Sequence, residues 1–186
     1  MTAAKNVVPT LDSDSGELTL HTGVTGRGAL MGHRLTILMT RWRVSVDWAG
    51  EEPASSTLTV DVDALEVVRG EGGPKGLSAP EKALVRSNAL KSLGAKKFPE
   101  IRFTADEIQQ IQDGYRLAGT LHICGKSRPH QVDVRTEDLG DSWRLSAESA
   151  VRQTDFGVKP FSMFMGSLKV ADEVALSFSA DWHKEV

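Results

Sequence analysis

The sequence predicts an all-β protein in which about eight antiparallel strands close into a barrel, with one α-helix between strands. Most of the chain alternates apolar and polar residues with a period of two, which is typical of half-buried strands. Only one stretch has a helical pattern. A barrel leaves no unpaired strand edge, although a β-sandwich has the same alternation and stays open as an alternative.

The first half of the chain predicts strands over 16–22, 34–48 and 56–64. In the last of these, "STLTVDVDA", Leu58, Val60 and the apolar residues that continue the alternation lie on one face of the strand. Thr and Asp residues lie on the other face. The alternation changes phase at Leu65. We expect a β-bulge there, because one extra residue on a continuing strand shifts the phase by one.

The second half predicts strands over 100–105, 115–123, 130–138, 142–151 and 172–182. Asp113-Gly114 and Gly140-Asp141 are turn signals between them. Their apolar residues in phase include Phe103, Leu117, Leu121, Leu145 and Phe178.

One segment, "SAPEKALVRSNALKSLG" (78–94), breaks the period of two. Ser78 and Glu81 have the spacing of a capping box, a Pro lies in the first turn, and Gly94 marks the end. We expect a helix that packs over the sheet or closes one end of it. Its predicted apolar stripe is Ala83, Leu84, Leu90 and Leu93.

Composition indicates one domain, over 16–186, after a flexible leader over 1–15 that is rich in Asp, Ser and Thr. The net charge of −3 leaves no excess of Lys and Arg for a phosphate backbone, so we expect no nucleic-acid partner. No run of about 18 apolar residues predicts a membrane span. The N-terminus has no apolar run of the length found in signal peptides, and Cys124 has no second cysteine to pair with, so we expect a cytoplasmic location.

The chain contains Asp155-Phe156-Gly157, a tripeptide that holds magnesium in protein kinases. The other kinase motifs are missing, and so is a P-loop. The five histidines lack metal-site spacing, and no Gly-x-Ser-x-Gly occurs. We therefore expect no catalytic residues, no metal and no cofactor, so that the protein is not an enzyme. A pocket that uses His21, His33 or Cys124 is the alternative.

The segment "GVKPFSMFMGSL" (157–168) is unusually apolar for a loop. Phe161, Phe164 and Met165 lie between Pro160 and Gly166, which mark the segment as irregular. A loop of this composition must cover either the mouth of the barrel or its own core.

Three segments, in this order, resemble the YceI family of lipocalin-like proteins that are proposed to bind polyisoprenoids. "FPEIRFTADEIQ" (98–109) is similar to the family's aromatic-Pro-x-Ile-x-Phe strand, and "LAGTLHICGKSRPHQVDV" (117–134) is similar to its Gly-x-Leu-Thr-Ile-His-Gly stretch, with Cys124 in place of the family's His. "VRQTDFGV" (151–158) resembles its Arg-x-Asp-Phe-Gly signature.

The resemblance implies a lipocalin-like, eight-stranded antiparallel β-barrel that binds an isoprenoid or a fatty-acyl type of ligand, and it also implies a possible homodimer. In that reading Arg152, Asp155 and Gly157 form a structural corner: Arg152 pairs with Asp155, and Gly157 allows the turn. Phe156 plugs the barrel, and Phe161, Phe164 and Met165 gate its mouth. The expected ligand-binding residues are Leu58, Val60, Phe103, Leu117, Leu121, Leu145, Phe156, Phe161, Phe164, Met165 and Phe178.

An alternative stays open, in which the barrel is filled by its own side chains. Such a protein would be a stress-related or protein-interaction module without a tight ligand. The four Trp and six Phe of the chain supply enough large side chains for this.

Overall fold

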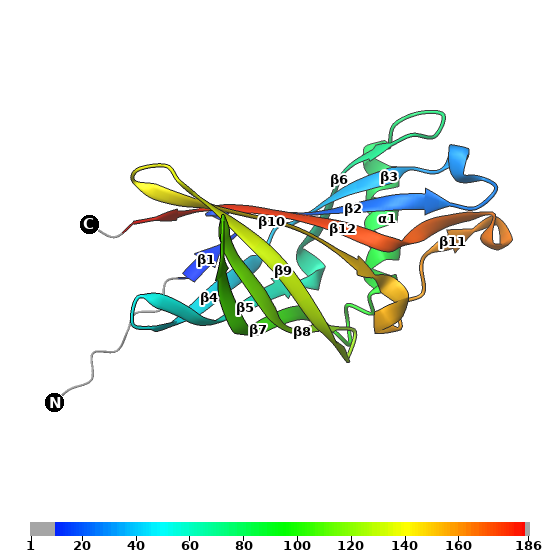
Figure 1. Ribbon diagram of the computed structural model, residues 1–186. Coiled ribbons are helices and arrows are strands. Elements are labelled where there is room, and N and C mark those ends of the chain that lie inside the picture. The colour runs from blue at the N-terminus through cyan, green and yellow to red at the C-terminus, as the bar shows by residue number, and fades with distance from the viewer. Residues whose placement is uncertain (1–9, 185–186) are drawn as a thin grey trace.

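A single curled antiparallel sheet forms a half-barrel in the computed structural model, which describes residues 10–184 (Figure 1). The sheet has twelve strands rather than the eight expected. They are β1 (Thr10–Asp12), β2 (Gly16–Thr25), β3 (Arg34–Met39), β4 (Trp42–Ala49), β5 (Glu52–Asp61), β6 (Leu65–Glu71), β7 (Glu100–Ile111), β8 (Gly114–Ile123), β9 (Lys126–Asp138), β10 (Ser142–Arg152), β11 (Ser162–Met163) and β12 (Leu168–His183).

The strands lie in the order β1, β4, β5, β7, β8, β9, β10, β12, β2, β3, β6, and β11 pairs with β12. From β7 to β10 the order follows the chain, because short turns such as Asp113-Gly114 join antiparallel neighbours, whereas β6 and α1 come between β5 and β7 in the sequence. Four 3₁₀ turns interrupt the strands: η1 (Ala29–Met31), η2 (Val62–Ala64), η3 (Gln153–Phe156) and η4 (Phe164–Gly166).

Two sharp corners, at 40–41 and at 62–64, explain much of the difference in strand number. The first divides the expected strand 34–48 into β3 and β4, and the second separates β5 from β6. The phase change at Leu65 therefore comes from the turn η2, and the expected β-bulge is wrong. Sequence alternation does not show such corners, because the apolar residues on both sides still point inward.

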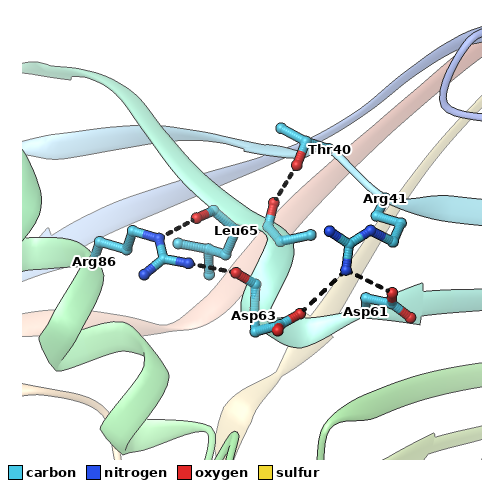
Figure 2. Close-up of polar contacts among 7 residues, drawn as sticks. Thr40, Arg41, Asp61, Asp63, Leu65 and Arg86 are labelled. Carbon is cyan, nitrogen blue, oxygen red and sulfur yellow. Dashed lines mark hydrogen bonds and ion pairs between the residues drawn. The ribbon is translucent and has the colours of Figure 1, made fainter.

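The two corners are joined by hydrogen bonds (Figure 2). The amide and the hydroxyl of Thr40 donate to the carbonyl of Ala64, at 3.0 and 2.8 Å. The amide of Asp61 donates to the carbonyl of Arg41 at 3.0 Å, and the Arg41 side chain lies 3.2 Å from the Asp61 carboxylate. The bends are therefore held as one unit.

Part of the segment expected to be a leader belongs to the fold. Residues 1–9 lie outside the described residues, but 10–15 belong to the fold, since β1 pairs with β4. Leu11 is only 5% exposed and packs in the core. A three-residue strand with one buried side chain is too short to show an alternation.

The helix α1 (Ala79–Ser92) begins with the predicted capping box. The amide of Ser78 donates to Glu81 Oε2 at 2.7 Å, and the amide of Glu81 donates to Ser78 Oγ at 3.4 Å. The packed stripe differs from the expected one, because Ala83 and Leu84 are exposed. The side chains that pack on the core are Val85, Ala89, Leu90 and Leu93.

The guanidinium of Arg86 ties α1 to the corner at η2. Its Nε donates to the carbonyl of Leu65 at 2.7 Å, and Nη2 donates to the carbonyl of Asp63 (Figure 2). No residue of α1 is fully buried, and these bonds add to the apolar contacts of Val85, Ala89, Leu90 and Leu93. In residues 10–184 no helix has the length and apolar character needed to cross a bilayer.

A half-exposed inner wall as candidate binding site

Two aromatic contacts across the half-barrel identify its inner face. The rings of Trp42 and Phe178 lie 5.2 Å apart, and those of Trp48 and Trp182 lie 5.6 Å apart, in edge-to-face geometry. These pairs join β4 to β12, which are not neighbours in the sheet. Even-numbered residues of β12 from 174 to 182 therefore face the interior, together with the β10 residues opposite them.

The interior contains two separate groups of buried side chains. The first lies under β1 to β6 and α1 and includes Trp42, Val60 and Leu65. The second lies under β7, β8 and η3 and includes Phe103, Leu121 and Phe156. Leu58, Ile101 and Leu93 are half-buried and pack against both groups.

A third part of the interior has apolar side chains that belong to neither group. We call it the inner wall, and it runs along β9, β10 and β12. Strand register places its members side by side: Val134 is opposite Ala147, and Ser149 is opposite Leu176. All are only partly buried. The members are His130, Val134, Ala147, Ser149, Val174 and Leu176.

An interior face that is mostly apolar and only partly buried is a surface that still has room for another apolar molecule. The two packed groups do not include Val134, Ala147, Val174 or Leu176, although these side chains face the same interior. The inner wall is thus the part of the molecule best suited to hold a long apolar ligand.

One polar pair lies in the inner wall. His130 Nε2 is 2.8 Å from Ser149 Oγ, and the ring of Phe103 packs edge-to-face on the imidazole with centroids 5.7 Å apart. Burial lowers the pKa of His130, because removal from water disfavours the charged ring. A neutral His–Ser pair is a hydrogen-bonding spot on an otherwise apolar surface.

Two indole N–H groups in the interior have no hydrogen-bond partner among the described residues. They are Nε1 of Trp42 and Nε1 of Trp48, and both atoms are buried. Buried donors are nearly always bonded in folded proteins, so each is suited to donate to an oxygen of a bound molecule.

Most of the expected ligand-binding residues lie in the two packed groups rather than in the inner wall. Val60, Phe103, Leu121 and Phe156 are buried, at 4%, 7%, 8% and 4% exposure. The half-buried ones are Leu58, Leu117, Leu145 and Phe178, which pack against those groups.

The expected mouth residues lie at one end of the half-barrel. Phe161 is partly buried, whereas Phe164 and Met165 are 70% and 108% exposed. The latter two do not cover the interior. The 3₁₀ turn η4 directs them outward, because both have left-handed backbone angles, with φ of 50° and 56°.

The corner at η3 has a different ion pair from the one expected. Arg152 Nε lies 3.3 Å from Asp172 Oδ2, and Asp155 is exposed without a described partner. Asp172 also accepts from the amide and the hydroxyl of Thr154, at 2.8 and 2.7 Å. Gly157 has a φ of 69° and ends the turn. The Asp that anchors this corner comes from β12, so local sequence could not identify it.

The alternative pocket of His21, His33 and Cys124 is not assembled. His33 Nε2 donates to the carbonyl of Lys75 at 2.7 Å, while His21 lies near Ser177. The Cys124 thiol donates to the carbonyl of Leu93 at 3.0 Å, and burial raises its pKa. Within residues 10–184 no three His, Cys, Asp or Glu side chains are grouped to hold a metal ion.

Two open cavities lie away from the inner wall. One of about 440 Å³ is lined by Phe98, Arg102 and His122 among others. The other, of about 610 Å³, lies beside Met165 and is lined by Lys159, Lys169 and Asp172 among others. Neither is lined by a residue of the inner wall.

Sequence reasoning missed His130, Trp42 and Trp48 as functional candidates. For His130 a signal was available: Ser149 lies in phase with Leu145 and Ala147 on an inward face. A Ser on an apolar strand face needs a polar partner from a neighbouring strand. No sequence pattern indicates that the indole N–H groups of Trp42 and Trp48 lack a hydrogen-bond partner.

Comparisons with known proteins agree with this architecture. The family model described as "YceI-like domain" matches residues 10–182. Among curated proteins, none matches the chain. The crystal structure of Burkholderia cenocepacia BcnA is similar, with 17% identity and a TM-score of 0.67, over 92% of this chain and 98% of that chain.

The Campylobacter jejuni YCEI protein is a second similar structure. It is 16% identical, with a TM-score of 0.58, over 81% of this chain and 85% of that chain. A mutant of the same protein with a monobromobimane guest gives the same values.

Proposed function

The chain belongs to the YceI-like domain family, and from that premise we propose that it binds one long apolar molecule, a polyisoprenoid or another long-chain lipid, along the inner wall of its half-barrel. The ligand is held without chemical change. Within this class, the inner wall selects a ligand by its elongated apolar shape and its low solubility in water, rather than through a specific pocket.

The single observation that carries the proposal is the apolar inner wall, which faces the interior but is only partly buried. Val134, Ala147, Val174 and Leu176 face the interior without being buried by it. Each buried CH₂ of a ligand contributes about 0.8 kcal/mol, so a chain lying along β9, β10 and β12 binds with few polar contacts.

The polar groups of the interior suggest how a ligand is oriented. His130 and Ser149 lie within the inner wall, and the free N–H groups of Trp42 and Trp48 lie on the opposite strand β4. A ligand with one oxygen-bearing end can bond to one of these sites, while its hydrocarbon part covers the apolar residues.

The experiment is native mass spectrometry of the freshly purified protein, followed by organic extraction, and by incubation of stripped protein with a long polyprenol. We expect one ligand per chain, recovered with unchanged mass. A protein that stays ligand-free after incubation with polyprenols and fatty acids would instead support the side-chain-filled module. The same spectra report the expected homodimer, which stays a prediction, as does the cytoplasmic location.

A further inference from the structure

Two loops project together from one end of the half-barrel. They are the β2–β3 loop, which contains η1, and the segment around β11 and η4 (Figure 1). The amide of Gly28 donates to the carbonyl of Ser167 at 2.7 Å, which holds the two loops side by side. The hairpins β4–β5 and β9–β10 lie at the opposite end (Figure 1).

Large apolar side chains are concentrated on these loops. Of the nine large hydrophobic residues that are exposed in the described part of the chain, five lie here. We call them the apolar tip: Leu30 (91% exposed), Met31 (61%), Met163 (45%), Phe164 (70%) and Met165 (108%). Exposed apolar side chains that gather in one place mark a surface for a partner or a membrane.

The backbone presents two of these side chains at a conformational cost. Phe164 and Met165 both have φ near the left-handed region, at 50° and 56°. That region suits Gly or Asn and is rare for an aromatic or a long side chain. The fold therefore retains a strained turn, and in this turn the side chains of Phe164 and Met165 are exposed to solvent.

Basic residues flank the apolar tip. Arg27 lies on the β2–β3 loop beside Gly28, and Lys159 and Lys169 line the cavity next to Met165. All three are exposed, and none forms an ion pair with a carboxylate of residues 10–184. Asp172 lines the same cavity, but its charge is offset by Arg152 at 3.3 Å.

The tip is thus locally cationic on a chain whose net charge is −3. An apolar projection with a basic rim matches the boundary between headgroups and acyl chains of an anionic bilayer, where apolar side chains insert and Lys and Arg attract anionic lipid. Phe and Met suit this environment, because a fluid bilayer adapts to the inserted side chains and no complementary binding surface is needed.

We propose that the apolar tip inserts into the headgroup boundary of an anionic lipid bilayer and docks the half-barrel there. Docking goes beyond ligand binding and does not depend on it. Docking places one end of the half-barrel, and so one end of the inner wall, at the bilayer. An apolar molecule can then pass from the bilayer to the inner wall without crossing water.

The test is flotation of the full chain with vesicles of phosphatidylcholine and phosphatidylglycerol, and with vesicles of phosphatidylcholine alone. The tip variant is Phe164→Asn with Met165→Asn, because Asn tolerates the left-handed backbone and keeps the turn. The matched control is Leu84→Gln with Leu139→Gln, which replaces two exposed apolar residues away from the tip.

We expect the wild-type chain and the control to float with the anionic vesicles, and the tip variant to bind about tenfold more weakly. A charge variant, Lys159→Gln with Lys169→Gln, should lose the preference for anionic over neutral vesicles, and about 0.5 M salt should weaken wild-type binding. The tip variant leaves the inner wall unchanged, so a loss of flotation in this variant reports docking rather than uptake of a lipid into the half-barrel.

Two results would overturn the proposal. The first is a wild-type chain that does not float with anionic vesicles, or a tip variant that floats as well as the control. The second is a wild-type dimer in sedimentation velocity that the tip variant converts to monomer without any vesicle binding, since the apolar tip would then be an interface between two copies of the chain.

Discussion

His130 Nε2 and Ser149 Oγ lie 2.8 Å apart on the concave face of the sheet, on the neighbouring strands β9 and β10. The pair brings a titratable group into the inner wall, whose other members are apolar. Because burial lowers the pKa of His130, the imidazole is kept neutral where an apolar ligand is proposed to lie.

This relationship predicts a loss of stability and of ligand binding in mild acid. The unfolded chain takes up a proton at His130 near pH 6.5, and the folded chain does so only at a lower pH. The free energy of unfolding should therefore fall as the pH drops from about 6.5 towards the folded pKa, and apolar ligand should be released as the folded ring becomes charged.

The variant His130→Gln should remove this part of the pH dependence. Its matched control is His122→Gln, which changes an exposed histidine bonded to Ser127 on the outer face. Urea titrations and polyprenol binding at several pH values between about 5 and 8 measure both effects. Identical pH profiles for wild type and His130→Gln would contradict the assignment.

Arg86→Lys should destabilise the fold by about 1–2 kcal/mol. Lys has no planar fork, so it cannot donate to the carbonyls of Leu65 and Asp63 together as Arg86 does. Urea denaturation measures the difference. Arg43→Lys, at an exposed position of β4, should be close to neutral. Equal effects of the two variants would mean that α1 is held by its apolar stripe alone.

Asp172→Asn should lower the melting temperature at neutral pH, because the amide has no charge and only one accepting oxygen, whereas Asp172 uses Oδ1 for the Thr154 amide and Oδ2 for the Thr154 hydroxyl and Arg152. The hydrogen bonds from Thr154, and then the charge of Arg152, lower the pKa of Asp172. Its contribution is present above the unfolded pKa of about 3.9 and is lost as the pH falls through the lower folded pKa.

The difference in melting temperature between wild type and Asp172→Asn should therefore shrink in strong acid. Asp155→Asn is the control, since Asp155 lies in the same corner but is exposed. If Asp155→Asn is the more harmful change at neutral pH, then the anchor is the one first expected from the motif and not Asp172.

Much of the fold could be predicted because inward-facing residues alternate along most strands. The faces that contain Phe103, Leu121 and Phe178 are inward in the structure, and the capping box starts α1 at the expected place. The family resemblance is confirmed by the match over residues 10–182.

Features that depend on contacts between distant segments could not be predicted. The corners at 40–41 and 62–64 are defined by bonds between them, and Arg152 finds Asp172 twenty residues away. Hydrophobicity identified residues that face inward, but it did not separate those that pack tightly, such as Val60, from those that leave room, such as Ala147. How deeply a residue is buried depends on the side chains that pack opposite it, and these come from distant parts of the sequence.

The most direct test of ligand binding along the inner wall is a pair of substitutions on β10. Ala147→Phe fills the inner wall beside Val134 and Phe178, whereas Ala150→Phe adds the same side chain to the exposed outer face of the same strand. Affinity for a long polyprenol is measured for both variants by native mass spectrometry, with the unfolding free energy checked in parallel.

We expect Ala147→Phe to weaken binding by about tenfold or more, since a new ring occupies space that several CH₂ groups of the ligand would fill, and Ala150→Phe to bind like wild type. Equal binding by the two folded variants would contradict this expectation, because the ligand would then lie somewhere other than the inner wall.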